Sequence, residues 1–289
     1  MTAALAGSDP DRWATILFVP ADQPSMLVKA QRRGADAILI DLEDAIPKRA
    51  KARARRQVRE HIQDGALDGP SAVCVRINAV GEGGVTDLHA LEGMRIDGVV
   101  LPKAADAVGL ARIREEVDRL LPDGEAVALI PQVESARGVV HLARLASTTN
   151  IAAIALGGED LCVDLGVPRS QDSLELLVPR ALVALHARAL GIPAIDTVYT
   201  AIDDEPGLAR EAAVARQLGF SGKLLIHPDQ IGPVSRVFAP SNVEIAWAQR
   251  VLASARQPVD HVRGVHLVDG KMVDAPVVAQ AQKILARAR

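Results

Sequence analysis

Carboxylate side chains stand directly after several short apolar runs of this sequence. Asp41 and Glu43 follow one such run, Glu134 follows another, and Asp160 follows a third. If these runs end at a common edge, their acids repel one another unless a cation lies among them. Oxygen ligands without a neighbouring Cys or His favour a hard ion such as Mg²⁺, with Mn²⁺ as the alternative. The pair Glu134 and Asp160 therefore predicts a metal site, although each acid alone could equally cap the helix that follows it.

Three basic side chains follow other apolar runs. Arg76 is expensive to bury unpaired, so it either forms an ion pair with Asp41 or Glu43 or clamps a substrate carboxylate. Lys103 would need a depressed pKa to form a Schiff base, and acidic neighbours raise that pKa instead. His227 precedes a proline, which is typical of the start of a helix.

Two further candidates lie outside these runs. Lys29 belongs to a basic group near the first helix, which is either a solvated face or a contact for the anionic tail of a large cofactor. Asp274 precedes Ala-Pro at the start of the last helix, a good N-cap position. Capping alone is a sufficient explanation for this residue, and a chemical role stays open.

These residues need elements that bring them to one edge. Eight apolar runs rich in Val, Ile, Leu and Ala alternate with segments of helical periodicity, which predicts strands buried on both faces of a parallel sheet. Eight strand–helix units are typical of a (β/α)₈ TIM barrel, whose reactive groups lie at the carboxyl ends of its strands. The runs are Ile16–Val19, Ala37–Ile40, Ala72–Ile77, Gly98–Leu101, Ala126–Val133, Ile151–Leu156, Ala194–Val198 and Gly222–Ile226. A doubly wound open sheet usually has fewer strands and a Gly-rich first turn, whereas here that turn is VPADQPS.

The chain continues well beyond the eighth run. We expect a barrel domain over residues 1–240 and, over 241–289, the last barrel helix and a C-terminal helical extension. Asn242–Ala255 is the segment expected to form the eighth barrel helix, and VDGK predicts a turn before a final helix. The extension is more than a barrel requires, so it is expected to cover the active site, either of its own chain or of a neighbouring subunit.

Composition excludes several classes of protein. The 289 residues carry 33 Lys and Arg against 36 Asp and Glu, and aromatic residues make up 2%, which argues against a nucleic-acid partner. No apolar run approaches the length of a membrane span, and the N-terminus does not resemble a signal peptide. The two cysteines, Cys74 and Cys162, form neither a metal knuckle nor a disulfide framework. We therefore expect a cytoplasmic enzyme.

Six motifs, in this order, resemble the HpcH/HpaI aldolase/citrate lyase superfamily. The resemblance runs from about Ile16 to the C-terminus and is strongest to the branch of citrate lyase β-subunit-like proteins and malyl- or citramalyl-CoA lyases. The motifs are LFVPADQPSMLVKAQRRGADAILIDLEDAIPKRAKARAR, VCVRINAVG, GVVLPKA, LIPQVESARGV, IALGGEDLCVDLG and LLIHPDQIGPVSRVFAPS.

The resemblance implies a TIM barrel that cleaves or forms carbon–carbon bonds in 3-hydroxyacyl-CoA thioesters, using Mg²⁺. It implies that Glu134 and Asp160 hold the metal and that Arg76 binds the substrate acid and polarises the reacting oxygens. Glu43, within the acidic DLED stretch around the metal and its waters, is counted with the catalytic residues. Asp274 would be an acid/base that enters the site of a neighbouring subunit, so the resemblance also implies a homo-oligomer, a trimer or hexamer.

Three functions stay open at this point. The favoured one is a CoA-thioester lyase that releases acetyl-CoA and a small 2-oxo acid from malyl-, citramalyl- or citryl-CoA. The alternatives are a β subunit active only inside a citrate lyase complex and a CoA-free, metal-dependent pyruvate aldolase. The sequence does not name the hydroxyacid, because one methyl group in a pocket changes binding by only ~1–3 kcal/mol.

Overall fold

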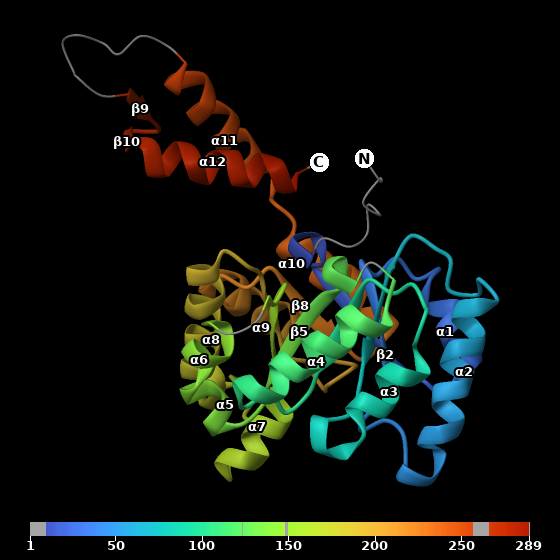
Figure 1. Cartoon of the computed structure of the whole chain (residues 1–289). Coiled ribbons are helices and arrows are strands. Elements are labelled where there is room, and N and C mark those ends of the chain that lie inside the picture. The colour runs from blue at the N-terminus through green and yellow to red at the C-terminus, as the bar shows by residue number, and fades with distance from the viewer. Residues whose placement is uncertain (1–9, 123, 148–149, 257–265, 289) are drawn as a thin grey trace. The chain divides into compact units, whose positions relative to one another are not determined.

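A closed barrel of eight parallel strands forms the larger part of the molecule (Figure 1). The computed structural model describes residues 10–122, 124–147, 150–256 and 266–288. The strands follow one another around the barrel in chain order, and β1 closes onto β8, which confirms the predicted TIM barrel. Their bounds are β1 Thr15–Pro20, β2 Ala37–Asp41, β3 Ala72–Arg76, β4 Gly98–Leu101, β5 Ala128–Val133, β6 Ile154–Leu156, β7 Ala194–Asp196 and β8 Gly222–Leu225.

Side chains fill the interior of the barrel. Every residue of β2, β3 and β5 is buried, as expected for strands covered on both faces. Alternate residues point inward, and Leu39, Cys74 and Ile130 belong to one buried cluster with Trp13 and Leu224. The barrel is therefore a packed core, and a ligand of the barrel is expected where its strands end.

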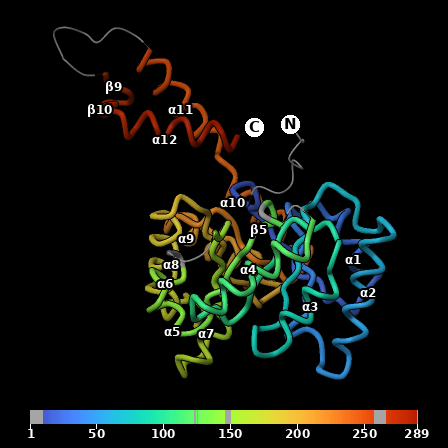
Figure 2. The backbone as a smooth tube through the Cα atoms, viewed as in Figure 1, coloured from blue at the N-terminus to red at the C-terminus, as the bar shows by residue number. Residues whose placement is uncertain are grey.

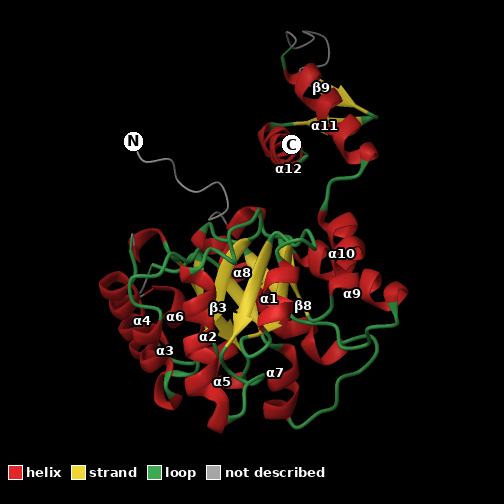
Figure 3. Cartoon of the chain, turned by 90° about the vertical axis from the view of Figure 1, so that its right-hand side faces the viewer, coloured by secondary structure: helices red, strands yellow, loops and turns green. Residues whose placement is uncertain are grey.

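Helices surround the strands on the outside (Figure 3). Asp106 and Asp204 cap the helices that follow them, and Gly191 and Gly219 end helices in the left-handed conformation, with φ of 74° and 105°. The helices are α1 Pro24–Ala30, α2 Lys51–Gln63, α3 Gly84–Ala90, α4 Ala107–Leu120, α5 Ala136–Val140, α6 Leu142–Ser147, α7 Gly158–Leu165, α8 Leu177–Leu190, α9 Glu205–Leu218 and α10 Ile231–Phe238.

A buried ionic network holds the helices around β7 and β8. The Lys223 ammonium is fully buried and donates to Asp196 and Glu211, both at 2.7 Å. Arg180 of α8 donates to Asp196 at 2.8 Å, and Arg169 donates to Glu211 at 3.0 Å. Such charges tolerate burial because each one is paired and hydrogen-bonded.

The chain divides into two compact units, Met1–Ser235 and Arg236–Arg289. The second contains α11 Asn242–Ala255, β9 His266–Val268, β10 Lys271–Val273 and α12 Ala275–Arg287. Within it, α11 packs along α12 (Figure 2) over a small apolar core that includes Ala248, Val251 and Ala281.

One prediction about this second unit is confirmed and another is wrong. The VDGK turn joins β9 and β10, with positive φ at Asp269 and Gly270, as predicted. The expectation that Asn242–Ala255 is the eighth barrel helix is corrected, because α10 is the helix that follows β8 and α11 belongs to the second unit. The apolar side chains of α11 pack against α12. The apolar periodicity of Asn242–Ala255 alone cannot distinguish this packing from packing against a barrel. Among the described residues, no helix is both long and apolar enough to cross a membrane.

Candidate active site

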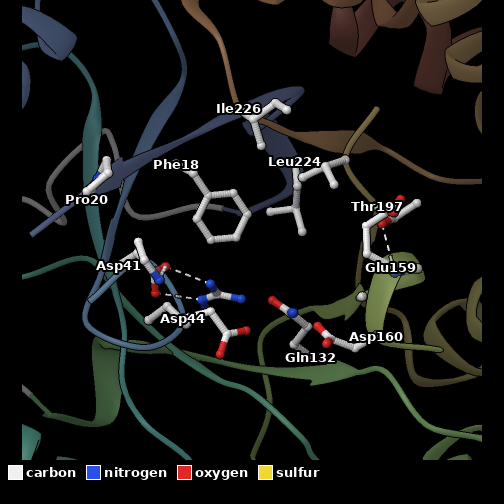
Figure 4. A pocket seen from close by; sticks show the side chains of 15 residues that line it. Phe18, Pro20, Asp41, Asp44, Gln132, Glu159, Asp160, Thr197, Leu224 and Ile226 are labelled. Carbon is white, nitrogen blue, oxygen red and sulfur yellow. Dashed lines mark hydrogen bonds and ion pairs between the residues drawn. The ribbon is translucent and has the colours of Figure 1, made fainter. Parts of the chain in front are cut away.

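A cavity of about 330 Å³ opens where the strands of the barrel end (Figure 4). Its polar wall brings together residues from three strands and from α7. Its apolar wall comes from β1, β7 and β8. The lining residues are Phe18, Pro20, Asp41, Asp44, Ala45, Arg76, Gln132, Gly157, Gly158, Glu159, Asp160, Thr197, Val198, Leu224 and Ile226. The strand ends therefore assemble one site, as the fold predicts.

Arg76 is clamped at the end of β3. Its Nε donates to Asp41 Oδ1 at 2.8 Å, its Nη2 donates to Asp41 Oδ2 at 2.7 Å, and its Nη1 lies 3.2 Å from Glu43 Oε2. The register places Asp41 directly opposite Arg76 on the neighbouring strand. The ring of Phe18 lies under the guanidinium, 4.7 Å from its carbon. Both predicted ion-pair partners are confirmed.

The ion pair with Arg76 keeps Asp41 ionised. Burial alone would raise the pKa of this carboxyl, but the hydrogen bonds and charge of Arg76 outweigh burial and lower it. Backbone N–H groups of Glu43 and Ala45 also donate to the Asp41 oxygens. Asp41 therefore stays ionised and holds Arg76 rigidly, while the remaining N–H groups of the five-donor guanidinium stay available for a ligand.

Glu134 follows β5 and is 3% exposed. Its Oε1 accepts a hydrogen bond from the backbone N–H of Lys103 at 2.6 Å, and its Oε2 accepts one from Gln132 Nε2. The next helix is capped by Ser135, which excludes the capping role for Glu134. Burial, with the charges of Glu43 and Asp160, raises the pKa of Glu134 to about 7.

Asp160 lies in the first turn of α7, a helix of eight residues whose N-cap follows the last residue of β6. The N-cap of α7 is Gly157, so Asp160 is also free of a capping role. Burial and the charge of Asp44 raise the pKa of Asp160. Glu134 and Asp160 thus lie at adjacent strand ends, and the charge of Asp160 helps to raise the pKa of Glu134. A bound cation would relieve this repulsion.

The donor set fits a magnesium ion. Among the described residues no group of three or more His, Cys, Asp or Glu side chains could hold a metal, so the pair Glu134 and Asp160 would supply the protein ligands. Mg²⁺ is usually held by one or two carboxylates and completes its octahedron with water and substrate oxygens. The pKa values of both acids are raised, with burial as the largest cause, so the neighbouring protein cations do not fully stabilise their ionised forms.

Lys103 lies beside this pair and has an unusual backbone. Its φ is 53°, in the left-handed region that non-glycine residues rarely adopt. Its ammonium lies 3.1 Å from Glu43 Oε1 and 3.2 Å from Glu82 Oε2. Burial opposes protonation, but these carboxylates outweigh it and raise the pKa of Lys103. The expectation that this amine stays charged is confirmed.

Glu43 is the acid that links Arg76 and Lys103. It is 2% exposed, and within the part of the chain that the structure describes neither carboxylate oxygen accepts a hydrogen bond of normal geometry. Burial raises the pKa of Glu43, although both cations oppose the shift. It contacts the arginine of the site without lining the cavity itself.

The remaining candidates lie elsewhere. Lys29 is exposed in the last turn of α1 and is not part of the cavity wall. Asp274 is the N-cap of α12, and its Oδ1 accepts a hydrogen bond from Val277 N at 3.1 Å. It belongs to the second unit and is exposed. His227 caps a short 3₁₀ helix, as its Pro neighbour predicts.

Sequence analysis missed three residues of the site: Phe18, Gln132 and Gly157. Gln132 precedes Glu134 by two positions, and residues two apart on a strand share a face, so periodicity held the signal. Gly157 is required by close approach, because a Cβ there would lie 2.6 Å from Glu134 Cβ and 2.9 Å from Gln132 Nε2. No local signal marks Phe18, whose role depends on the distant Arg76.

The chain is similar in sequence to a described protein family and to several known proteins. Residues 14–228 match the family described as HpcH/HpaI aldolase/citrate lyase. A citrate lyase subunit beta from Leuconostoc mesenteroides subsp. cremoris is 38% identical over 282 residues, covering 94% of this chain and 91% of that protein. A (3S)-malyl-CoA thioesterase from Cereibacter sphaeroides is 35% identical over 275 residues, covering 95% of this chain and 94% of that protein.

Solved structures extend the similarity to the fold. The CitE protein of Mycobacterium tuberculosis, in complex with magnesium, acetoacetate and coenzyme A, aligns with a TM-score of 0.79 and 35% identity. That alignment covers 95% of this chain and 97% of CitE. A citrate lyase beta subunit from the same organism, with oxaloacetate and magnesium, aligns with a TM-score of 0.68 and 33% identity, over 80% of this chain and 99% of that one.

Proposed function

The chain belongs to the HpcH/HpaI aldolase/citrate lyase family, and we propose that it is a magnesium-dependent carbon–carbon lyase acting on a 3-hydroxyacyl-CoA thioester. One observation carries the proposal. Asp160 lines the same cavity as the clamped guanidinium of Arg76, and Glu134 accepts a hydrogen bond from Gln132 of the cavity wall. The pKa values of both acids are raised. Relatives that bind magnesium together with coenzyme A or 2-oxo acids support it.

The substrate's chemistry matches these charges. In cleavage the hydroxyl proton leaves, the carbon–carbon bond breaks, the hydroxyl carbon becomes the carbonyl of a 2-oxo acid, and the electron pair forms a thioester enolate. A magnesium ion held by Glu134 and Asp160 would supply Lewis-acid stabilisation of the 2-oxo acid. Arg76 binds the substrate carboxylate and offsets the developing negative charge, a kind of interaction worth ~3 kcal/mol in many enzymes.

Three further residues take roles that rest on the family alone. Glu43 supports the charge of Arg76 and the water around the metal. Lys29, exposed on α1, meets the anionic tail of CoA. Asp274 protonates the enolate carbon to give acetyl-CoA, acting from a neighbouring subunit of a homo-oligomer, a trimer or hexamer. An N-cap aspartate is compatible with that role because its second oxygen remains available.

Thioester hydrolysis is the second candidate activity, because a relative of 35% identity is named (3S)-malyl-CoA thioesterase. Because some relatives are citrate lyase β subunits, a third possibility is a subunit that is active only within a citrate lyase complex. A CoA-free pyruvate aldolase is the remaining alternative within the family.

Product analysis separates the lyase, the thioesterase and the CoA-free aldolase. The purified chain is incubated with malyl-, citramalyl- and citryl-CoA and Mg²⁺, and the products are identified by mass spectrometry. The proposal expects acetyl-CoA with a 2-oxo acid from at least one thioester. Free CoA with an intact hydroxyacid would indicate hydrolysis instead. No product from any thioester, with cleavage of free hydroxy-2-oxo acids, would indicate the CoA-free aldolase.

A further inference from the structure

Gln132 carries an unsatisfied acceptor at the wall of the cavity. Its side chain is 3% exposed, and its Oε1 has no hydrogen-bond partner among the described residues, whereas its Nε2 donates to Glu134 Oε2. Figure 4 shows the Gln132 amide among the side chains of the cavity wall. A buried acceptor without a donor is costly, so this oxygen calls for a partner that arrives with the ligand.

The orientation of the amide follows from its neighbour. Exchanging Nε2 and Oε1 would set an amide oxygen against the Glu134 carboxylate and lose the hydrogen bond to Oε2. Glu134 therefore fixes Nε2 toward itself and leaves Oε1 as the free end. The ligand partner must be a hydrogen-bond donor, because a carboxylate or carbonyl oxygen would repel Oε1.

We propose that Gln132 Oε1 accepts the hydrogen bond of the substrate hydroxyl and makes Gln132 a specificity-determining residue. The inference rests on the proposed function. At the reacting end of a 3-hydroxyacyl thioester, the carboxylate and thioester carbonyl are acceptors, and the hydroxyl alone is a donor. The orphan acceptor and the sole donor are complementary.

This contact serves recognition rather than proton removal. A neutral amide is too weak a base to take the hydroxyl proton, but it fixes the direction of the O–H bond. A site built to bond a hydroxyl rejects the analogue that lacks it, because the buried polar group is then left unpaired. Gln132 thereby selects hydroxyacyl thioesters over the corresponding deoxy thioesters.

The test uses two CoA thioethers in which a methylene replaces the thioester carbonyl, one with the hydroxyl and one without it. Neither can form the enolate, so neither is cleaved. Calorimetry at saturating Mg²⁺ gives the affinity ratio of this pair for the wild type, Gln132→Leu and Gln132→Met. Loss of the Gln132–Glu134 hydrogen bond affects both ligands alike, and the ratio cancels it.

The wild type is expected to bind the hydroxylated thioether roughly tenfold tighter or more, and both variants are expected to lose most of that preference. Two variants are used because the unbranched Met keeps the length of Gln if Leu does not fold. If folded variants keep the wild-type ratio of affinities for the two thioethers, the assignment is overturned. If they keep that ratio but bind Mg²⁺ more weakly, Oε1 instead accepts a hydrogen bond from a water bound to the metal. No preference in the wild type overturns it as well.

Failure of the proposed function is distinguishable. A wild type that releases acetyl-CoA but whose variants keep the hydroxyl preference contradicts only the role of Gln132. A wild type that acts on no thioester at all, in the product analysis above, contradicts the proposed function, and the assignment of Gln132 falls with it.

Discussion

The backbone N–H of Lys103 donates to Glu134 Oε1 at 2.6 Å, from a residue whose φ is 53°. This left-handed conformation costs a non-glycine residue about 1–2 kcal/mol. Ion pairs of the Lys103 ammonium with Glu43 and Glu82 hold the residue in place. The strained turn after β4 thus aims an amide at a carboxylate of the site.

Two substitutions of Lys103 separate its backbone from its ammonium. Both Lys103→Gly and Lys103→Val remove the charge, but glycine keeps the left-handed turn at no steric cost, whereas a β-branched residue resists it. Calorimetric titration with Mg²⁺ is expected to show affinity roughly tenfold weaker for the valine variant than for the glycine variant. Equal affinities would mean that the turn does not position Glu134.

The close approach of Gly157 to Glu134 gives a second prediction. A Cβ at Gly157 would lie 2.6 Å from Glu134 Cβ, whereas a Cβ at Gly81 would meet nothing within 4 Å. Gly157→Ala is expected to displace Glu134 and to abolish detectable Mg²⁺ binding, while Gly81→Ala binds as the wild type does. Mg²⁺ binding by a folded Gly157→Ala protein would show that the carboxylate has room to move.

Much of this site was predictable, since strand ends and residue types are local features. The eight apolar runs located the barrel, and acids placed just after Val133 and within the turn after Leu156 located the pair proposed to hold the metal. Their capping alternative was resolved only by the N-caps that the structure shows, Ser135 for α5 and Gly157 for α7. The left-handed turn at Lys103 and the role of Phe18 were not predictable, because both depend on residues far along the chain.

The raised pKa of Glu134 predicts how the metal-free protein responds to pH. Burial, with Glu43 and Asp160, raises it from 4.5 to about 7, so the folded state keeps a proton that the unfolded state has lost. Stability therefore falls as pH rises from 4.5 to about 7, by at most about 3 kcal/mol, and stays lower above that range.

Glu134→Gln removes this titration. Urea unfolding in EDTA is expected to show that the wild type loses stability relative to the variant between pH 4.5 and about pH 7. The variant also controls for the other acids, which titrate in both proteins. A difference in unfolding free energy that does not change with pH would contradict the shifted pKa.

Substitution of Asp274 distinguishes a role as a helix N-cap from a role as a catalytic acid. Asn caps a helix about as well as Asp, so a purely structural role makes Asp274→Asn nearly silent in both stability and activity. A proton-transfer role predicts normal unfolding and normal Mg²⁺ binding with a rate loss of roughly 10²–10⁴. Steady-state kinetics and thermal unfolding of this one variant decide between them.

Mixed oligomers test whether that acid crosses between subunits. Inactive Asp274→Asn and inactive Arg76→Ala proteins are combined and allowed to exchange. A site shared between subunits regains part of the activity, because some sites receive an intact residue from each chain. A mixture that stays inactive, although mass spectrometry shows mixed oligomers, would place the acid within its own chain or outside the reaction.

The central claim is that Glu134 and Asp160 hold the metal on which carbon–carbon cleavage depends. Its most direct measurement is acetyl-CoA release from a cleaved hydroxyacyl-CoA during titration with Mg²⁺, for the wild type, Glu134→Gln and Asp160→Asn. We expect saturable activation of the wild type, loss of activity in EDTA, and no turnover by either folded variant at any Mg²⁺ concentration. Full acetyl-CoA release in excess EDTA, or by either variant, would contradict the claim.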